Sequence, residues 1–140
     1  MSGIRPRGIN KNVDNLVITC IDHRFQRVIA KLLKDEHRVD IEASDRIAYA
    51  GASKAVADGT LISNIQISYR LHNIKNIWLI DHTDCGGFGG LKAYEDDEQK
   101  EVQAHFDSFS QATEAIKNVL PQLKVNVFVV SLDGESIKPS

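Results

Sequence analysis

The chain has 140 residues, of which 42% are hydrophobic and 26% are charged, and its formal net charge is −2. This length suits one domain and is enough to bury a core without disulfide bonds. The near-average composition and small net charge exclude a global electrostatic attraction for nucleic acid. No apolar segment approaches the roughly 20 residues that a membrane span needs. We therefore expect one domain over residues 1–140, with a short polar N-terminal arm over residues 1–15.

The arm and the cysteine content also bear on the cellular compartment. The arm has no apolar centre, so we do not expect it to act as a secretory signal. Cys20 and Cys85 are the two cysteines and could form one disulfide bond. Nothing in the composition indicates an oxidising compartment, so we expect reduced thiols and a cytoplasmic protein.

The first half of the chain predicts two strands and two helices. Residues 16–20 form a short apolar run that is typical of a buried strand. Apolar residues then recur at helical spacing, which predicts a helix over residues 25–34. A weaker strand is predicted over residues 46–50, because Gly51 ends the apolar run. One face of a second helix is apolar over residues 57–69.

The second half repeats this alternation. The third predicted strand, residues 76–80, is entirely apolar after its first residue. Four glycines in five residues predict a loop over residues 86–90, since glycine weakens helices and strands. A long helix is predicted over residues 102–120, ending near Pro121, and a fourth strand over residues 125–130.

Strands that alternate with helices and are continuously apolar indicate a parallel sheet covered on both faces. We therefore predict an α/β fold with an open, four-stranded, mainly parallel sheet. In such a sheet, ligands bind beyond the C-terminal ends of the strands, where the strand order reverses.

Three candidate metal ligands lie near such ends. Cys20 is the last residue of the first predicted strand, and His82 and Cys85 follow the third. They converge if those two strands are neighbours. Two thiolates and one imidazole favour zinc over magnesium or calcium, and three protein ligands leave a fourth position for water.

Each of these features has a simpler explanation when it is taken alone. A single cysteine at a strand end is more often a small buried hydrophobic residue. Asp22 is suited to cap the following helix, which would leave Arg24 as a surface residue. The other histidines show no partner pattern, and surface or helix-face positions are expected for them: His23, His37, His72 and His105.

The two motifs together resemble the β-class carbonic anhydrases. They are Cys20-x-Asp22-x-Arg24 and, after the third strand, His82-x-x-Cys85 followed by two glycines. The resemblance runs from about residue 16 to the end of the fourth strand. It implies the strand order 2-1-3-4, which makes the first and third strands neighbours. It also implies a zinc lyase that hydrates carbon dioxide reversibly to bicarbonate, assembled as a homodimer or higher homo-oligomer.

The resemblance also implies catalytic roles for Asp22 and Arg24. Zinc lowers the pKa of water, which makes a nucleophile available near neutral pH. Asp22 would accept a hydrogen bond from that nucleophile and orient it. Arg24 would hold Asp22 away from the metal through a charge-assisted pair. In some members of the family the aspartate ligates zinc instead, and the sequence leaves both states open.

The chain departs from the family pattern at three places. Ala48 and Tyr49 stand where Arg-Asn is common, Asp81 stands where glycine usually precedes the metal histidine, and the arm is short. Other functions therefore stay open. They are hydrolysis of carbonyl sulfide or carbon disulfide, an inactive zinc protein that binds an anion or nucleotide, and a structural-zinc or redox role. The redox role is the weakest, because there is no Cys-x-x-Cys motif.

Overall fold

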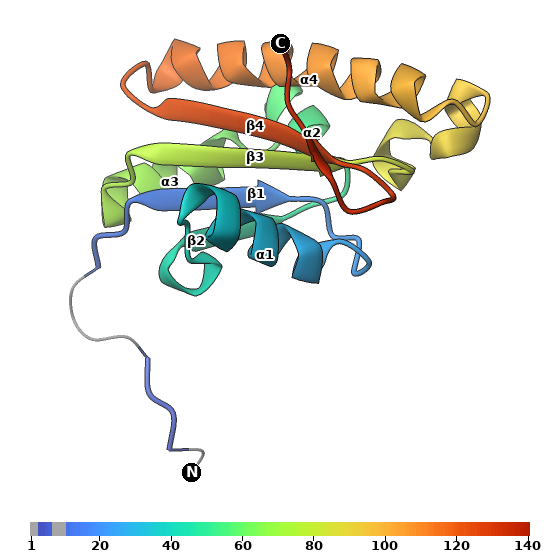
Figure 1. Cartoon of the computed structure of the whole chain (residues 1–140). Coiled ribbons are helices and arrows are strands. Elements are labelled where there is room, and N and C mark those ends of the chain that lie inside the picture. The colour runs from blue at the N-terminus through green and yellow to red at the C-terminus, as the bar shows by residue number, and fades with distance from the viewer. Residues whose placement is uncertain (1–2, 7–10) are drawn as a thin grey trace.

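The structure is a computed structural model that describes residues 3–6 and 11–140, and a five-stranded sheet forms its centre (Figure 1). The strand order is β2-β1-β3-β4-β5. The first four strands are parallel, and β5 pairs antiparallel with β4. The predicted order 2-1-3-4 is confirmed. The strands are β1 (Asn15–Thr19), β2 (Asp45–Ala48), β3 (Asn76–His82), β4 (Lys124–Val130) and β5 (Ser136–Ile137).

Helices cover both faces of the sheet, as predicted. Helix α1 (Gln26–His37) packs on one face, and α2 (Ser53–Ala57), α3 (Ile62–His72) and α4 (Glu98–Val119) pack on the other. Three short 3-10 helices lie in the connections: Ile41–Ala43, Gly86–Phe88 and Leu91–Tyr94. Helix α1 runs three residues beyond the predicted end at residue 34, and α4 begins four residues before the predicted start.

The alternation of side chains along β1 divides the core into two layers. Leu16 and Ile18 pack with residues of α2, α3 and α4, whereas Val17 packs with residues of α1. Successive side chains of a strand point to opposite faces, so a strand buried on both sides is apolar at every position. This explains the apolar runs over residues 16–18 and 77–80 in the central strands β1 and β3, whereas the edge strand β2 is only partly buried.

The expected helix over residues 57–69 is wrong as a single element, because a turn separates α2 from α3. Gly59 has a φ of +91°, a conformation that a helix cannot include. The Asp58 side chain accepts a hydrogen bond from the Thr60 N–H at 2.9 Å, which stabilises the turn. The strand β5 was not predicted, since two residues show no periodicity.

Part of the predicted N-terminal arm lies outside the described residues, namely 1, 2 and 7–10. Asn15, the last residue of the predicted arm, is the first residue of β1. Among the described residues, no helix is both long enough and apolar enough to cross a membrane.

Candidate metal centre

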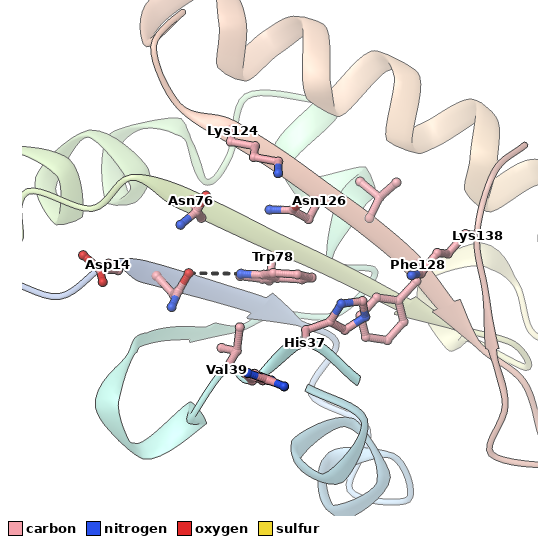
Figure 2. A pocket seen from close by; sticks show the side chains of 12 residues that line it. Asp14, His37, Val39, Asn76, Trp78, Lys124, Asn126, Phe128 and Lys138 are labelled. Atoms are coloured by element: carbon pink, nitrogen blue, oxygen red, sulfur yellow. Dashed lines mark hydrogen bonds between the residues drawn. The ribbon is translucent and has the colours of Figure 1, made fainter. Parts of the chain in front are cut away.

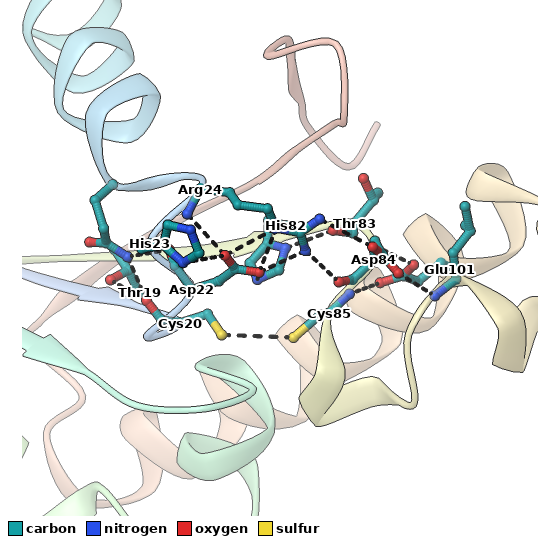
Figure 3. A network of polar contacts seen from close by, with 12 residues as sticks. Thr19, Cys20, Asp22, His23, Arg24, His82, Thr83, Asp84, Cys85 and Glu101 are labelled. Atoms are coloured by element: carbon teal, nitrogen blue, oxygen red, sulfur yellow. Dashed lines mark hydrogen bonds and ion pairs between the residues drawn. The ribbon is translucent and has the colours of Figure 1, made fainter.

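Cys20, His82 and Cys85 meet at the C-terminal edge of the sheet (Figure 3). β1 ends at Thr19, so Cys20 follows the strand rather than being its last residue as predicted. The parallel register pairs Thr19 with Ile80 of β3, so Cys20 emerges beside the end of β3. Each of the three offers one ligand atom, and these atoms all lie within 4.8 Å of one another. The two sulfur atoms are 3.9 Å apart, and all three residues are buried. Such a group could bind one metal ion.

His82 lies in a different place from the one predicted and is fixed on two sides. It is the last residue of β3 rather than part of the following loop, because β3 pairs with β4 through His82 and Val130. Its Nδ1 lies 2.6 Å from the Thr83 carbonyl oxygen, which can only accept a hydrogen bond, so Nδ1 carries the proton. The Phe25 ring stacks on the imidazole with 4.1 Å between centroids.

These contacts leave the Nε2 atom of His82 as the available ligand atom. It is buried and has no hydrogen-bond partner among residues 3–6 and 11–140, which is costly unless the atom binds something. A proton held on Nδ1 by a backbone carbonyl is the usual arrangement of a histidine that ligates a metal through Nε2. The orphaned nitrogen therefore fits a metal ligand.

The two thiols share one hydrogen bond and differ in acidity. The Cys85 thiol donates to Cys20 and lowers the pKa of Cys20 to about 3, against the effect of burial. The same interaction raises the pKa of Cys85, and burial raises it further. Zinc requires thiolates, so binding would displace the remaining proton. Two sulfur donors and a neutral imidazole fit zinc.

Asp22 and Arg24 form a close ion pair beside this cluster. Arg24 Nε lies 3.1 Å from each carboxylate oxygen of Asp22, and a terminal nitrogen of Arg24 lies 2.7 Å from Oδ2. The Arg24 side chain lowers the pKa of Asp22 to about 2, so the carboxylate is ionised at neutral pH. Asp22 Oδ2 is also 3.8 Å from His82 Nε2, on the ligand side of the imidazole.

The helix-cap explanation for Asp22 is wrong in its detail. The N-cap position of α1 is Phe25, and no side chain caps the helix there. Asp22 instead accepts the backbone N–H of Arg24 at 2.9 Å, which closes the turn before the helix. Gln26 also braces this turn, since its side-chain amide donates to the carbonyl oxygens of Cys20 and Asp22.

Asp84 joins the ion pair to the loop over residues 83–90, the metal loop, and was not singled out in the sequence. Its carboxylate lies 3.2 Å from a terminal nitrogen of Arg24, and its carbonyl oxygen accepts from the other. The second carboxylate oxygen accepts the Leu91 N–H at 2.9 Å, which lowers the pKa of Asp84. Its position between the motif residues His82 and Cys85 could have indicated from the sequence that it takes part in the site.

His105 lies on a helix face, one of the two positions expected, but the expectation that it has no partners is wrong, because it is fully buried behind the metal loop. Its ring nitrogens lie 2.6 Å from Asp81 and 2.9 Å from Glu101. Burial lowers the pKa of His105, but these two carboxylates outweigh it and raise the pKa to about 9. Glu101 and His105 are four residues apart and share the buried face of α4 with Ala112, which is a signal that the sequence did contain.

None of the remaining histidines offers a ligand atom to the cluster, although His23 Nδ1 lies 3.9 Å from Asp22 Oδ1. His23 is at the surface, with its side chain 96% exposed. His72 is half-buried and lies 2.7 Å from Asp45, and the His37 ring contacts Trp78 and Phe128. His37, Trp78 and Phe128 line a cavity of about 510 Å³ over the N-terminal ends of β3 and β4 (Figure 2). This cavity contains none of the three candidate ligands.

Two glycines allow the metal loop to approach the end of β2. A Cβ atom on Gly87 would lie 2.6 Å from the Cα atom of Gly51, so any side chain would push the two segments apart. The Gly51 N–H is among the smaller causes that lower the pKa of Cys20. The glycine-rich loop is therefore needed for close packing around the cluster.

Comparison with known proteins gives a family match and two sequence relatives. The family model described as "Putative carbonic anhydrase" matches residues 10–137. An uncharacterized protein of Rickettsia bellii (strain RML369-C) is 36% identical over 129 residues, which cover 85% of this chain and 77% of the relative. An uncharacterized protein of Rickettsia conorii (strain ATCC VR-613 / Malish 7) is 35% identical over 129 residues, covering 85% of this chain and 68% of the relative.

The fold is also similar to a solved structure. The crystal structure of β-carbonic anhydrase isoform I from Trichomonas vaginalis matches with a TM-score of 0.60. The match covers 95% of this chain and 86% of that chain, at 14% sequence identity. At this identity the likeness concerns the fold, and it agrees with the parallel strand order described above.

Proposed function

This chain belongs to the family described as "Putative carbonic anhydrase", and we propose that it is a zinc lyase that hydrates carbon dioxide reversibly to bicarbonate. The observation that carries the proposal is the convergence of Cys20, His82 and Cys85 within 4.8 Å, with an ionised Asp22 beside them. Three protein ligands of these types, with a fourth position left for water, are an arrangement that catalytic zinc sites use.

Cys20, His82 and Cys85 would hold the zinc ion, and the fourth position would stay open. When bound, zinc lowers the pKa of water and so supplies a nucleophile near neutral pH. Asp22 would accept a hydrogen bond from this nucleophile and orient it toward carbon dioxide. Asp22 can do so because its pKa of about 2 keeps it an acceptor at every physiological pH.

Arg24 keeps Asp22 in this role. It contacts both oxygens of the carboxylate and is itself anchored by Asp84, so a movement of Asp22 onto the metal would break several charge-assisted hydrogen bonds. We therefore favour the open state of the site, with Asp22 paired to Arg24 rather than bound to zinc.

The proposal includes a reducing, cytoplasmic environment and a homodimer or higher homo-oligomer. The two free thiols lie 3.9 Å apart, so oxidation would threaten the ligand pair. Two large apolar side chains of α3, Ile67 and Leu71, are 43% and 56% exposed near the edge strand β2, and a second copy could cover them. Light scattering that shows a monomer at micromolar concentration would contradict the oligomer.

The function is tested by metal analysis and stopped-flow carbon dioxide hydration on the same purified protein. We expect one zinc per chain and hydration well above the buffer rate. Sulfide release from carbonyl sulfide or carbon disulfide, without hydration, would change the substrate. Stoichiometric zinc with neither reaction, together with a co-purified anion or nucleotide, would instead favour a binding protein.

A further inference from the structure

A buried polar cluster lies directly behind the metal loop and has no role in the proposed chemistry. Asp81, Glu101 and His105 are at most 1% exposed, and His105 lies between the two carboxylates. Burying two carboxylates is costly, and such clusters are weak sources of stability compared with apolar packing. Their presence therefore calls for another explanation.

We propose that Glu101 and His105 are positioning residues that hold the loop from Asp84 to Cys85 in its ligand-binding conformation before a metal binds. This inference rests on the metal-binding part of the proposed function. In this inference Glu101 holds the backbone of the loop, and His105 keeps Glu101 in the orientation that does so.

Glu101 holds two consecutive backbone amides of the loop. Its Oε1 accepts the Asp84 N–H at 2.7 Å, and its Oε2 accepts the Cys85 N–H at 3.1 Å (Figure 3). Between these amides the chain is strained, since Asp84 has a φ of +53° in the left-handed region. A non-glycine residue keeps this conformation only where its surroundings impose it. Glu101 supplies that constraint at the residue before the ligand.

His105 connects Glu101 to the strand that carries His82. Its Nε2 contacts Glu101, one helical turn away on α4, and its Nδ1 contacts Asp81, the residue before His82 on β3. A network through α4 thus joins the His82 strand to the Cys85 loop, independently of the chain between them. Its two carboxylates and one imidazole are all hydrogen-bonded, as a buried polar network requires.

Asp81 is itself held from the other side. Its carboxylate accepts the Ser53 N–H at 3.1 Å and the Ser53 hydroxyl at 2.5 Å, and the Ser108 hydroxyl lies 2.7 Å from that of Ser53. A glycine at position 81 could make none of these contacts. Asp81, which stands where the family usually has glycine, is therefore the residue that anchors the network to β3 and to Ser53.

The test replaces Glu101 by its neutral isostere and measures zinc affinity by chelator competition. Glu101→Gln places an amide donor against an N–H donor of the loop or against His105. We expect zinc affinity to fall about 10–100-fold, the usual effect of removing a partner that orients a ligand. The cobalt-substituted protein should show altered ligand-field absorption. Glu114→Gln, on the exposed side of α4, is the matched control and should match the wild type.

A folded Glu101→Gln protein with wild-type zinc affinity and cobalt spectrum would overturn the inference. A purely structural role would lower the melting temperature without changing either of these measurements. His105→Gln keeps Glu101 beside the loop but removes the imidazole bridge, so we expect a smaller loss of affinity in the same direction.

If both variants fail to fold, hydrogen exchange on the wild type tests whether the loop is held in place before zinc binds. The Asp84 and Cys85 amides should exchange more slowly than the amide of exposed Gly86, with and without zinc. Protection that appears only with zinc would overturn pre-positioning. A wild type that binds no zinc would defeat the proposed function, whereas its metal-free exchange would still report on the loop.

Discussion

The two cysteines of the candidate metal centre lie in regions of opposite character, although their sulfur atoms are 3.9 Å apart. Cys20 leads into a turn at the surface, where the side chains of His23 and Arg24 are 96% and 44% exposed. Cys85 lies in a loop whose amides are bound by Glu101, which is fully buried. One half of the site faces solvent and the other half is part of the core.

This difference separates two requirements of the proposed enzyme. Ligand geometry needs a rigid support, and the buried half provides it through hydrogen bonds that water cannot replace. Substrate and protons need access, and the exposed half provides it through the turn that carries Asp22. Arg24 joins the halves, because it contacts both Asp22 and Asp84. Variants on the two sides should therefore fail in different ways.

The largest effect should come from removing a ligand on either side. Cys85→Ser and Cys20→Ser should each weaken zinc binding on the order of a thousandfold, since about 10–16 kcal/mol of binding energy is shared among few ligands. Metal analysis after dialysis against a weak chelator measures this. Equal, stoichiometric zinc in the wild type and Cys85→Ser would remove Cys85 from the ligand set.

The buried half should also give the protein an alkaline sensitivity. The pKa of His105 is raised from 6.5 to about 9, so its contribution to folding is complete below pH 6.5 and is lost as pH rises to about 9. The loss should be on the order of 3 kcal/mol. Urea unfolding of the metal-free protein measures it, and His105→Gln should lack this component.

Titration of the cysteines also changes the free energy of unfolding in this pH range. It does so equally in the wild type and in His105→Gln, so the difference between their two pH profiles isolates His105. His23→Gln, at a side chain that is 96% exposed, is the control. Identical pH dependence in the wild type and His105→Gln would show that the buried imidazole is not held charged by its two carboxylates.

The architecture was predictable because parallel strands have a strong local signal. Strands buried on both faces appear as short apolar runs, and β1, β3 and β4 were found from such runs. The edge strand β2 is only partly buried, and its signal in the sequence was weaker. The order 2-1-3-4 came from the family resemblance and is confirmed. The break at Gly59 and the two-residue β5 depend on local turn geometry and on pairing, and neither changes the apolar pattern.

The site was predictable only for residues at or just after strand ends. Cys20, His82 and Cys85 were placed together because parallel strands end at one edge of the sheet. Glu101 was missed because its role depends on where α4 packs. The stacking of Phe25 on His82 was missed for the same reason, since an aromatic residue at a helix start predicts burial and not a particular partner.

On the exposed half, Asp22→Asn should lower carbon dioxide hydration about a hundredfold, the typical cost of one well-placed catalytic hydrogen bond. Asparagine can still accept the Arg24 N–H, so the turn and the zinc content should persist. Stopped-flow assays at equal zinc occupancy measure the rate. Asp35→Asn, on the exposed side of α1, is the control. Full activity in an Asp22→Asn variant of an active enzyme would reduce Asp22 to closing the turn.

The smallest effect should come from Arg24→Lys. This change keeps the positive charge between the two halves but removes the guanidinium group, whose several nitrogens contact both halves at once. Arg24 reaches both oxygens of Asp22 and the carboxylate of Asp84 at once, and a lysine, with a single nitrogen, cannot span these contacts. Asp22 would remain ionised but less firmly oriented, so hydration should fall about tenfold, at the lower end of effects from groups that support a ligand or catalyst. Zinc affinity should hardly change, because Glu101 still fixes the Cys85 loop. Arg27→Lys, at an exposed position on α1, is the matched control.

A hundredfold loss, equal to that of Asp22→Asn, would show that the guanidinium is needed for every productive orientation of the carboxylate. A loss of zinc would mean that the exposed half also supports the ligands, which would contradict the division between the two halves.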